Sequence, residues 1–151
     1  MSAARIGTGI RVGMVAAAGT IGAVIGLGLR HGLALRPFMA TGRGLIDAFG
    51  LDVTSPPATA LIGLALVALA LIVLGVCFTL VAASLRGIGL LVAAAVFGAL
   101  GWAVSVYVVP SVLVSTSGAV LGTAQRVFVC SMLALALVVG MRLARLDLDT
   151  H

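Results

Sequence analysis

The chain has 151 residues, of which 62% are hydrophobic and only 9% are charged. A soluble domain usually carries about 25% charged residues, and here the few charges lie between long uncharged runs, so a water-soluble globule and a disordered chain are both excluded. The net charge of +5 comes from arginines at the ends of those runs, where membrane proteins carry topology signals, and it does not indicate nucleic-acid binding. We therefore predict an all-α integral membrane protein.

The first apolar run begins after Arg11 and ends before Arg30. A helix that crosses a bilayer needs about 20 residues, so this run predicts a first transmembrane helix over residues 11–30. A secretory signal peptide is the alternative, because Arg5 and Arg11 provide a basic leading segment. The run is longer than the usual signal-peptide core of about 7–15 residues, and no small-x-small cleavage motif follows it, so we expect the segment to be retained.

Residues 31–57 form the longest connection between apolar runs, and a Ser-Pro-Pro stretch lies near its end. Within it, apolar residues and glycine recur at helical spacing, while Thr41, Arg43 and Asp47 face elsewhere. This pattern predicts a short amphipathic helix over residues 38–49 that lies at the level of the lipid headgroups. An irregular loop is the alternative.

Two long apolar runs follow, over residues 58–85 and 88–109, and only Arg86 and Gly87 separate them. Because this connection is so short, the runs predict an antiparallel hairpin of the second and third transmembrane helices. The first of the two is longer than a bilayer requires, so it has to tilt or to extend beyond the hydrocarbon.

The fourth predicted span covers residues 118–141 and has to include Arg126, because the uncharged run after Arg126 is too short to cross a hydrocarbon core about 30 Å thick. We therefore predict a single membrane domain over residues 1–151, with four transmembrane helices in an up-down bundle. The amphipathic segment is predicted to be an interfacial helix between the first and second spans.

The arginines divide between the two sides of such a bundle, and the short connection with Arg86 favours a cytoplasmic location for its own side. Both chain termini share that side, so we expect them in the cytoplasm, with the protein in the inner (plasma) membrane of a bacterial-type cell. One side would carry Arg5, Arg11, Arg86, Arg142 and Arg145, and the other Arg30, Arg36, Arg43 and Arg126.

Small residues line faces of two predicted spans, in a chain that contains 20 glycines. Membrane helices associate by close van der Waals approach, and small side chains permit that approach. Each face predicts either a contact with a partner subunit or a second copy, or packing inside this protein's own bundle. The first span contributes Ala18, Gly19, Gly22 and Gly26, and the third contributes Ala95, Gly98 and Ala99.

Arg126, next to Gln125, is the one ionisable residue expected inside a span, and the two form a candidate site for an anion or a polar solute. A residue at the edge of a late-starting span is the alternative for Arg126. Trp102 is expected to seek a partner inside the bundle or at a subunit contact. Predicted interfacial anchors are Tyr107, Arg30, Arg142 and Arg145.

The spans contain no acidic residue, and the sequence has no metal-ligand spacing, phosphate-binding loop or nucleophile–base arrangement. We therefore expect no enzyme activity, no metal and no cofactor. The leading hypothesis is a non-catalytic structural or assembly subunit of a larger membrane complex, with membrane lipids and other membrane subunits, or further copies of itself, as partners. The alternatives are a small self-associating transporter or channel that uses Arg126, and a binder of lipids or other hydrophobic molecules.

Overall fold

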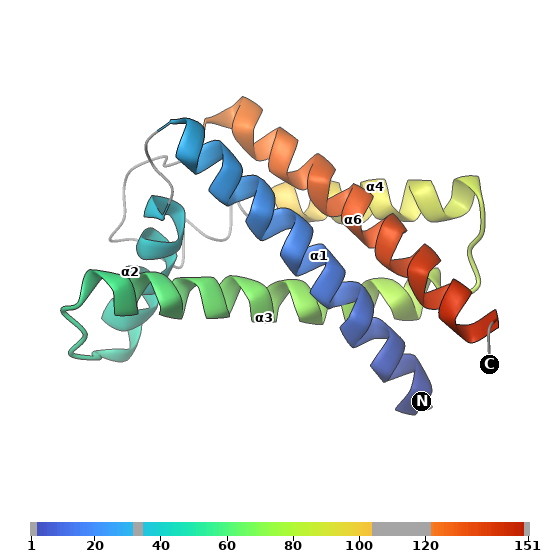
Figure 1. Ribbon diagram of the computed structural model, residues 1–151, viewed down its shortest axis with the longest axis horizontal. Helices are drawn as coiled ribbons and strands as arrows, with labels where there is room; N and C mark the ends of the chain where they lie inside the picture. Colours follow the sequence, from blue (N-terminus) through green and yellow to red (C-terminus); the bar gives the residue numbers. More distant parts are fainter. Residues whose placement is uncertain (1–2, 32–34, 104–121, 150–151) are drawn as a thin grey trace.

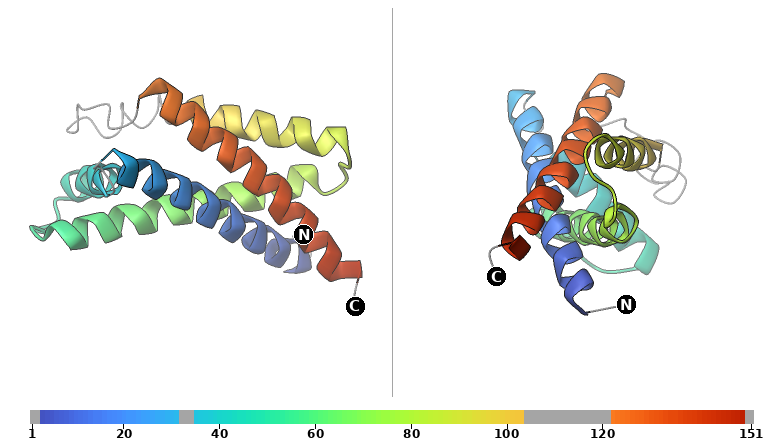
Figure 2. Two further views of the ribbon diagram at one scale, coloured as in Figure 1. Left: turned by 45° about the horizontal axis from the view of Figure 1, so that its top comes forward. Right: turned by 90° about the vertical axis from the view of Figure 1, so that its right-hand side faces the viewer.

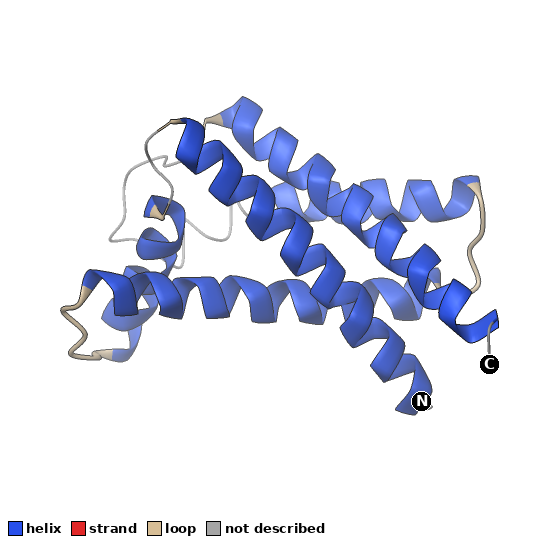
Figure 3. Ribbon diagram, in the orientation of Figure 1, coloured by secondary structure: helices blue, strands red, loops and turns tan. Residues whose placement is uncertain are grey.

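The computed structural model describes residues 3–31, 35–103 and 122–149 of the chain. Within these ranges it contains helices and no strand, as Figure 3 shows. The all-α prediction is confirmed for this part of the chain. The five helices are α1 (Ala3–Arg30), α2 (Arg36–Phe49), α3 (Pro56–Ala82), α4 (Ile88–Ala103) and α6 (Thr123–Asp149) (Figure 1).

The four longer helices form two antiparallel pairs that lie in two layers (Figures 1 and 2). In one layer α1 lies beside α6, and in the other α3 continues through a short connection into α4. The two layers cross obliquely, whereas the helices of an up-down bundle lie about 20° from parallel. Alternating helix direction is therefore present, but the predicted four-helix up-down bundle is not confirmed.

Two helices begin earlier in the chain than the predicted spans. Helix α1 begins at Ala3 and so includes Arg5, ahead of the predicted span over residues 11–30, because no proline interrupts the helix there. Helix α3 begins at Pro56, just before the predicted span over residues 58–85. Proline is favourable in the first turn of a helix, where its missing N–H has no partner to lose.

Helix α6 is displaced toward the C-terminus from the predicted span over residues 118–141. Gly122 is not helical, the helix starts at Thr123, and it continues past residue 141 to Asp149. Residues 118–121 lie outside the described part of the chain, as do residues 104–109 at the end of the predicted third span. The described length of α4, 16 residues, gives about 24 Å at 1.5 Å per residue.

Helix α2 spans residues 36–49 and agrees with the helix expected over residues 38–49. Its apolar face packs inside the protein: Phe38, Gly42 and Ile46 are buried, and the helix contacts α3. The apolar side of the amphipathic pattern therefore contacts α3, and the charged side is exposed.

Glycine makes the helix crossings close. A Cβ atom added to Gly13 of α1 would lie 2.6 Å from Cα of Ile72 in α3, and one added to Gly75 of α3 would collide with the backbone of Gly13. Where α1 meets α6, a Cβ on Gly140 would lie 3.2 Å from Cα of Val12. Backbones that approach this closely leave no room for the side chains that hold helices further apart, so each crossing is fixed by small residues.

Between these crossings lies an apolar core shared by all four longer helices. Val12, Phe78 and Leu137 are completely buried and come from α1, α3 and α6. The ring of Phe78 meets that of Phe97 in α4 edge to face, with ring centres 5.3 Å apart, a favoured aromatic geometry. This contact packs α4 against α3.

Three described helices are long and apolar enough to cross a membrane: α1 from Arg5, α3 throughout, and α6 as far as Leu146. Helix α3 has the most exposed apolar surface, because only 22% of the residues in its most apolar stretch are buried within the molecule. Soluble proteins rarely leave such an apolar surface uncovered, so a membrane location is compatible with this structure.

The two classes of glycine on α1 should respond in opposite ways to alanine. Gly13→Ala should lower the stability of the detergent-solubilised protein by about 1–3 kcal/mol, because the added methyl group has to push the backbone of α3 away. Gly22→Ala, on the same helix, adds a methyl group that meets nothing within 4 Å, and it should be neutral or stabilise by up to about 1 kcal/mol through helix propensity. Thermal unfolding followed by circular dichroism measures both. Equal melting temperatures for the two variants would contradict the α1–α3 crossing.

Candidate functional site

The small residues predicted on α1 lie on its exposed side. Ala18, Gly19, Gly22 and Gly26 are all exposed, and a Cβ atom added to Gly22 or Gly26 would meet nothing within 4 Å. Gly19 lies at the border of this side, because its added Cβ would lie 3.0 Å from Cβ of Ala136 in α6. Of the two alternatives for this face, packing inside the described bundle does not apply to Gly22 and Gly26.

The predicted face on α4 is divided between two surroundings. Gly98 is buried, and a Cβ atom on it would lie 3.0 Å from the carbonyl oxygen of Cys130 in α6. Ala95 and Ala99 are exposed. Only the glycine of this group therefore serves the α4–α6 contact.

The glycines that form the α1–α3 crossing, Gly9, Gly13 and Gly75, are not among the predicted packing residues. A signal for them exists, because Gly9 and Gly13 are four residues apart, the same spacing as Gly22 and Gly26. Since both pairs fit the same small-xxx-small pattern, the spacing alone does not distinguish the internal face of α1 from the exposed one.

Gln125 and Arg126, the candidate polar site, lie in the first turn of α6. The backbone N–H of Gly122 donates to Oε1 of Gln125 at 3.0 Å, and the N–H of Arg126 donates to the carbonyl oxygen of Gly122 at 3.0 Å. Gly122 is the N-cap residue, and a glutamine three residues later that accepts from the N-cap N–H forms half of a capping box. Gln125 therefore stabilises the start of the helix, and Arg126 is half-buried near that start, where a late-starting span would place it.

Arg145, predicted to be an interfacial anchor, reaches across to the end of α3. Its Nη2 atom donates to the carbonyl oxygens of Ala82 at 3.2 Å, Ala83 at 3.4 Å and Leu85 at 2.6 Å. The last carbonyls of a helix have no partner within the helix and carry its negative dipole end, so a cation is favourable there. Arg145 thus joins the last turns of α6 to the α3–α4 connection.

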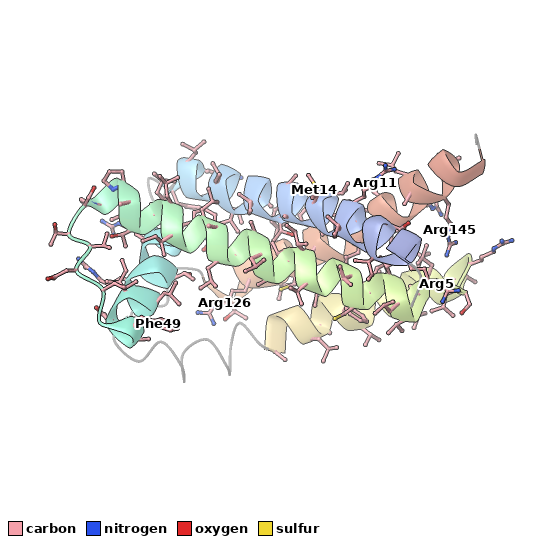
Figure 4. The ribbon with its side chains drawn as sticks, turned by 90° about the horizontal axis from the view of Figure 1, so that it is seen from below. Arg5, Arg11, Met14, Phe49, Arg126 and Arg145 are labelled. Atoms are coloured by element: carbon pink, nitrogen blue, oxygen red, sulfur yellow. The ribbon has the colours of Figure 1, made fainter. Side chains whose placement is uncertain are left out.

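The remaining predicted anchors are placed only in part. Arg30 and Arg142 are exposed near the ends of their helices, so their role as anchors stays a prediction. Tyr107 lies outside the described residues, and so does the side chain of Trp102. In Figure 4, Arg5, Arg11 and Arg145 lie toward one end of the molecule, and Arg126 lies toward the other.

The role of Arg145 as a helix-end clamp predicts a local effect of its loss. Arg145→Gln should lower the free energy of unfolding by about 1.5–3 kcal/mol, the range for hydrogen bonds to a charged group, and should speed hydrogen exchange at the amide of Leu85, which bonds to the carbonyl of Ala82. Arg142→Gln is the matched control, because Arg142 is exposed on the same helix. Faster exchange in both variants alike would rule out a specific clamp.

Hydroxyl groups in the helices mostly bond to the carbonyl of the preceding turn. Thr79 Oγ1 donates to Gly75 O at 2.8 Å, and Thr59 Oγ1 to Ser55 O at 3.0 Å. Thr20, at the centre of the internal face of α1, is different: it is 6% exposed, and its hydroxyl oxygen has no hydrogen-bond partner among the described residues. A buried hydroxyl without a partner costs about 1–3 kcal/mol.

Replacing Thr20 with valine, which has the same shape, tests whether that hydroxyl is without a partner in the folded protein. Thr20→Val should melt at the same temperature as the wild type or above it, because the substitution removes the cost of desolvating the hydroxyl. Thr79→Val, which deletes a hydroxyl with a hydrogen bond, is the comparison. A lower melting temperature for Thr20→Val in purified protein would mean that the hydroxyl has a partner.

The described residues offer no other chemical centre. Among them, no group of three or more histidine, cysteine, aspartate or glutamate side chains could hold a metal ion. The two cysteines, Cys77 and Cys130, are not joined in a disulfide. Comparison with protein-family models, with curated proteins and with solved structures finds no match for this chain.

Proposed function

We propose that this protein is a non-catalytic structural or assembly subunit of a larger membrane complex. The observation that supports the proposal is the open face of α1, defined by Ala18, Gly22 and Gly26. Other small-residue contacts on the described helices, such as those of Gly13, Gly75 and Gly98, are filled by a neighbouring helix of the same chain. The open face has the same composition and spacing but no occupant within the described chain.

The shape of this face suits a further helix. Met14, which is 58% exposed, and Leu29, which is 68% exposed, lie on the same side of α1 and bound the small residues along the helix axis. A helix placed between these two side chains can bring its backbone close to Gly22 and Gly26. In lipid, where no hydrophobic force drives helices together, such close contact supplies most of the energy of association.

The proposed location is the inner (plasma) membrane of a bacterial-type cell, with α1, α3, α4 and α6 as the four spans. Both chain ends lie at the same end of the molecule as the α3–α4 connection (Figure 1), and Arg5, Arg11, Arg86, Arg142 and Arg145 belong to these segments. The excess of arginine in cytoplasmic segments favours this end as the cytoplasmic one. The described charge at the opposite end is nearly as large, so this orientation rests mainly on the short α3–α4 connection.

Bulky residues on the open face should prevent assembly without unfolding the protein. In the double variant Gly22→Leu/Gly26→Leu, the added side chains enter open space, so the helix content and the melting temperature of the isolated protein should stay within about 1 kcal/mol of stability of the wild type. Association with a partner or with a second copy should fall at least about tenfold, the equivalent of 1.4 kcal/mol. Native mass spectrometry after extraction into lipid nanodiscs measures the association.

The matched control is Ala95→Leu/Ala99→Leu, which enlarges two exposed small residues at the same spacing on α4. This variant should assemble like the wild type. If the α4 variant loses assembly and the α1 variant keeps it, the proposed face is contradicted. A wild-type protein that stays a monomer in nanodiscs would contradict the assembly role itself.

A further inference from the structure

Helix α2 lies across α3 near the beginning of α3, and it runs transverse to the α3 axis in both Figure 1 and Figure 2. The crossing is formed by Gly42 and Gly63, where a Cβ atom on Gly63 would lie 2.8 Å from the backbone nitrogen of Gly42. This backbone contact holds α2 at a fixed height along α3. With α3 along the membrane normal, a helix transverse to it lies in the plane of the membrane.

The height of the crossing can be compared with the thickness of a bilayer. Gly63 precedes Leu69, the middle residue of α3, by six positions, which is about 9 Å along the helix axis. The hydrocarbon core extends about 15 Å from its centre, so with α3 centred the crossing lies about 6 Å inside the hydrocarbon edge. Interfacial amphipathic helices bury their apolar face to about this depth, 5–10 Å.

The ends of α2 carry apolar side chains that the described protein does not cover. Leu35 precedes the helix and is 51% exposed, whereas Phe49 and Leu51, at its other end, are 72% and 50% exposed. Gly50 between them has a left-handed backbone, with φ 61°, and the N–H of Leu51 donates to the carbonyl of Ile46 at 3.0 Å. This closing turn holds Leu51 back toward the helix and keeps Phe49 and Leu51 at the same end.

The charged side chains of α2 are exposed on a different side of the helix. Arg36, Arg43 and Asp47 follow one another at helical spacing and are all exposed, while the contact with α3 uses Phe38 and Gly42. Over residues 35–55 the two arginines are balanced by Asp47 and Asp52. Within this segment an attraction to anionic lipids therefore has no net charge to act on, and burial of apolar surface drives its binding.

We propose that α2 is an interfacial helix that fixes the depth of the protein in the membrane. It lies in the membrane plane at the boundary between hydrocarbon and headgroups, with Leu35, Phe49 and Leu51 inserted into lipid. Its partner is the lipid surface, and binding does not depend on lipid charge. Through the Gly42–Gly63 contact the helix sets the height of α3 in the bilayer. The inference rests on the proposed crossing of the membrane by α3, and not on the proposed assembly role.

Depth-dependent quenching of tryptophan fluorescence tests this placement in the full-length protein, reconstituted into phosphatidylcholine vesicles after Trp102→Phe has removed the native tryptophan. Phe49→Trp and, as a second variant, Leu51→Trp report on the end of α2. Leu69→Trp is the control, because Leu69 is 59% exposed at the middle of α3. Phospholipids brominated near the headgroup should quench residues 49 and 51 about twofold more than lipids brominated near the chain ends, and residue 69 should show the reverse order.

Each other result overturns a stated part of the inference. Quenching of residues 49 and 51 by aqueous acrylamide alone would place α2 outside the membrane. A depth equal to that of residue 69 would place the end of α2 at the bilayer centre and refute its position at the headgroup boundary. Protection from both kinds of quencher would mean that a second copy covers the apolar ends. A Leu69→Trp protein without quenching by deep bromines would refute the crossing by α3, and with it the inference. A shift in depth when phosphatidylglycerol is added would refute the independence from charge.

Discussion

The arrangement of this protein depends on the close backbone contact between α1 and α3 at Gly13 and Gly75. Helices in lipid gain little from hydrophobic burial against each other, so they pack where small residues let their backbones meet. At this crossing α1 and α3 lie too close for any side chain between them, and their axes cross obliquely instead of running nearly parallel. A second close contact, at Gly140, packs α6 against another side of α1. The two layers therefore meet α1 through close contacts at glycines of α1, α3 and α6.

Two further contacts join the ends of this arrangement. The ring of Phe78 meets Phe97 and holds α4 to α3, and the guanidinium of Arg145 bonds to the last carbonyls of α3 and to the connection beyond it. Arg145 brings a cation to the negative dipole end of α3, where it donates to carbonyl oxygens at the end of the helix and beyond it. This contact joins segments that are about 60 residues apart in the sequence.

What the internal contacts leave uncovered is the basis of both proposals. On α1 the internal face and the open face carry the same kind of residue, and among the described residues only the internal one is filled by a neighbouring helix. On α2 the glycine contact with α3 fixes the position of the helix but leaves its apolar ends uncovered by the described residues. A surface of small residues suits a helix backbone, whereas large flexible side chains beside exposed charges suit the edge of a bilayer.

The sequence by itself determined the all-α class, the apolar helices and the existence of α2, because hydropathy and helix periodicity are local properties. It did not determine the helix crossings. Gly9 and Gly13 have the same spacing as Gly22 and Gly26, and which pair becomes internal depends on the neighbour that each side of α1 meets. The partners of Arg145 and the capping role of Gln125 likewise became visible only in the structure: the first joins distant segments, and the second depends on where α6 begins. Which glycine pair is internal, and which carbonyls Arg145 meets, depend on how the helices are placed in space, and spacing along the chain does not specify that placement.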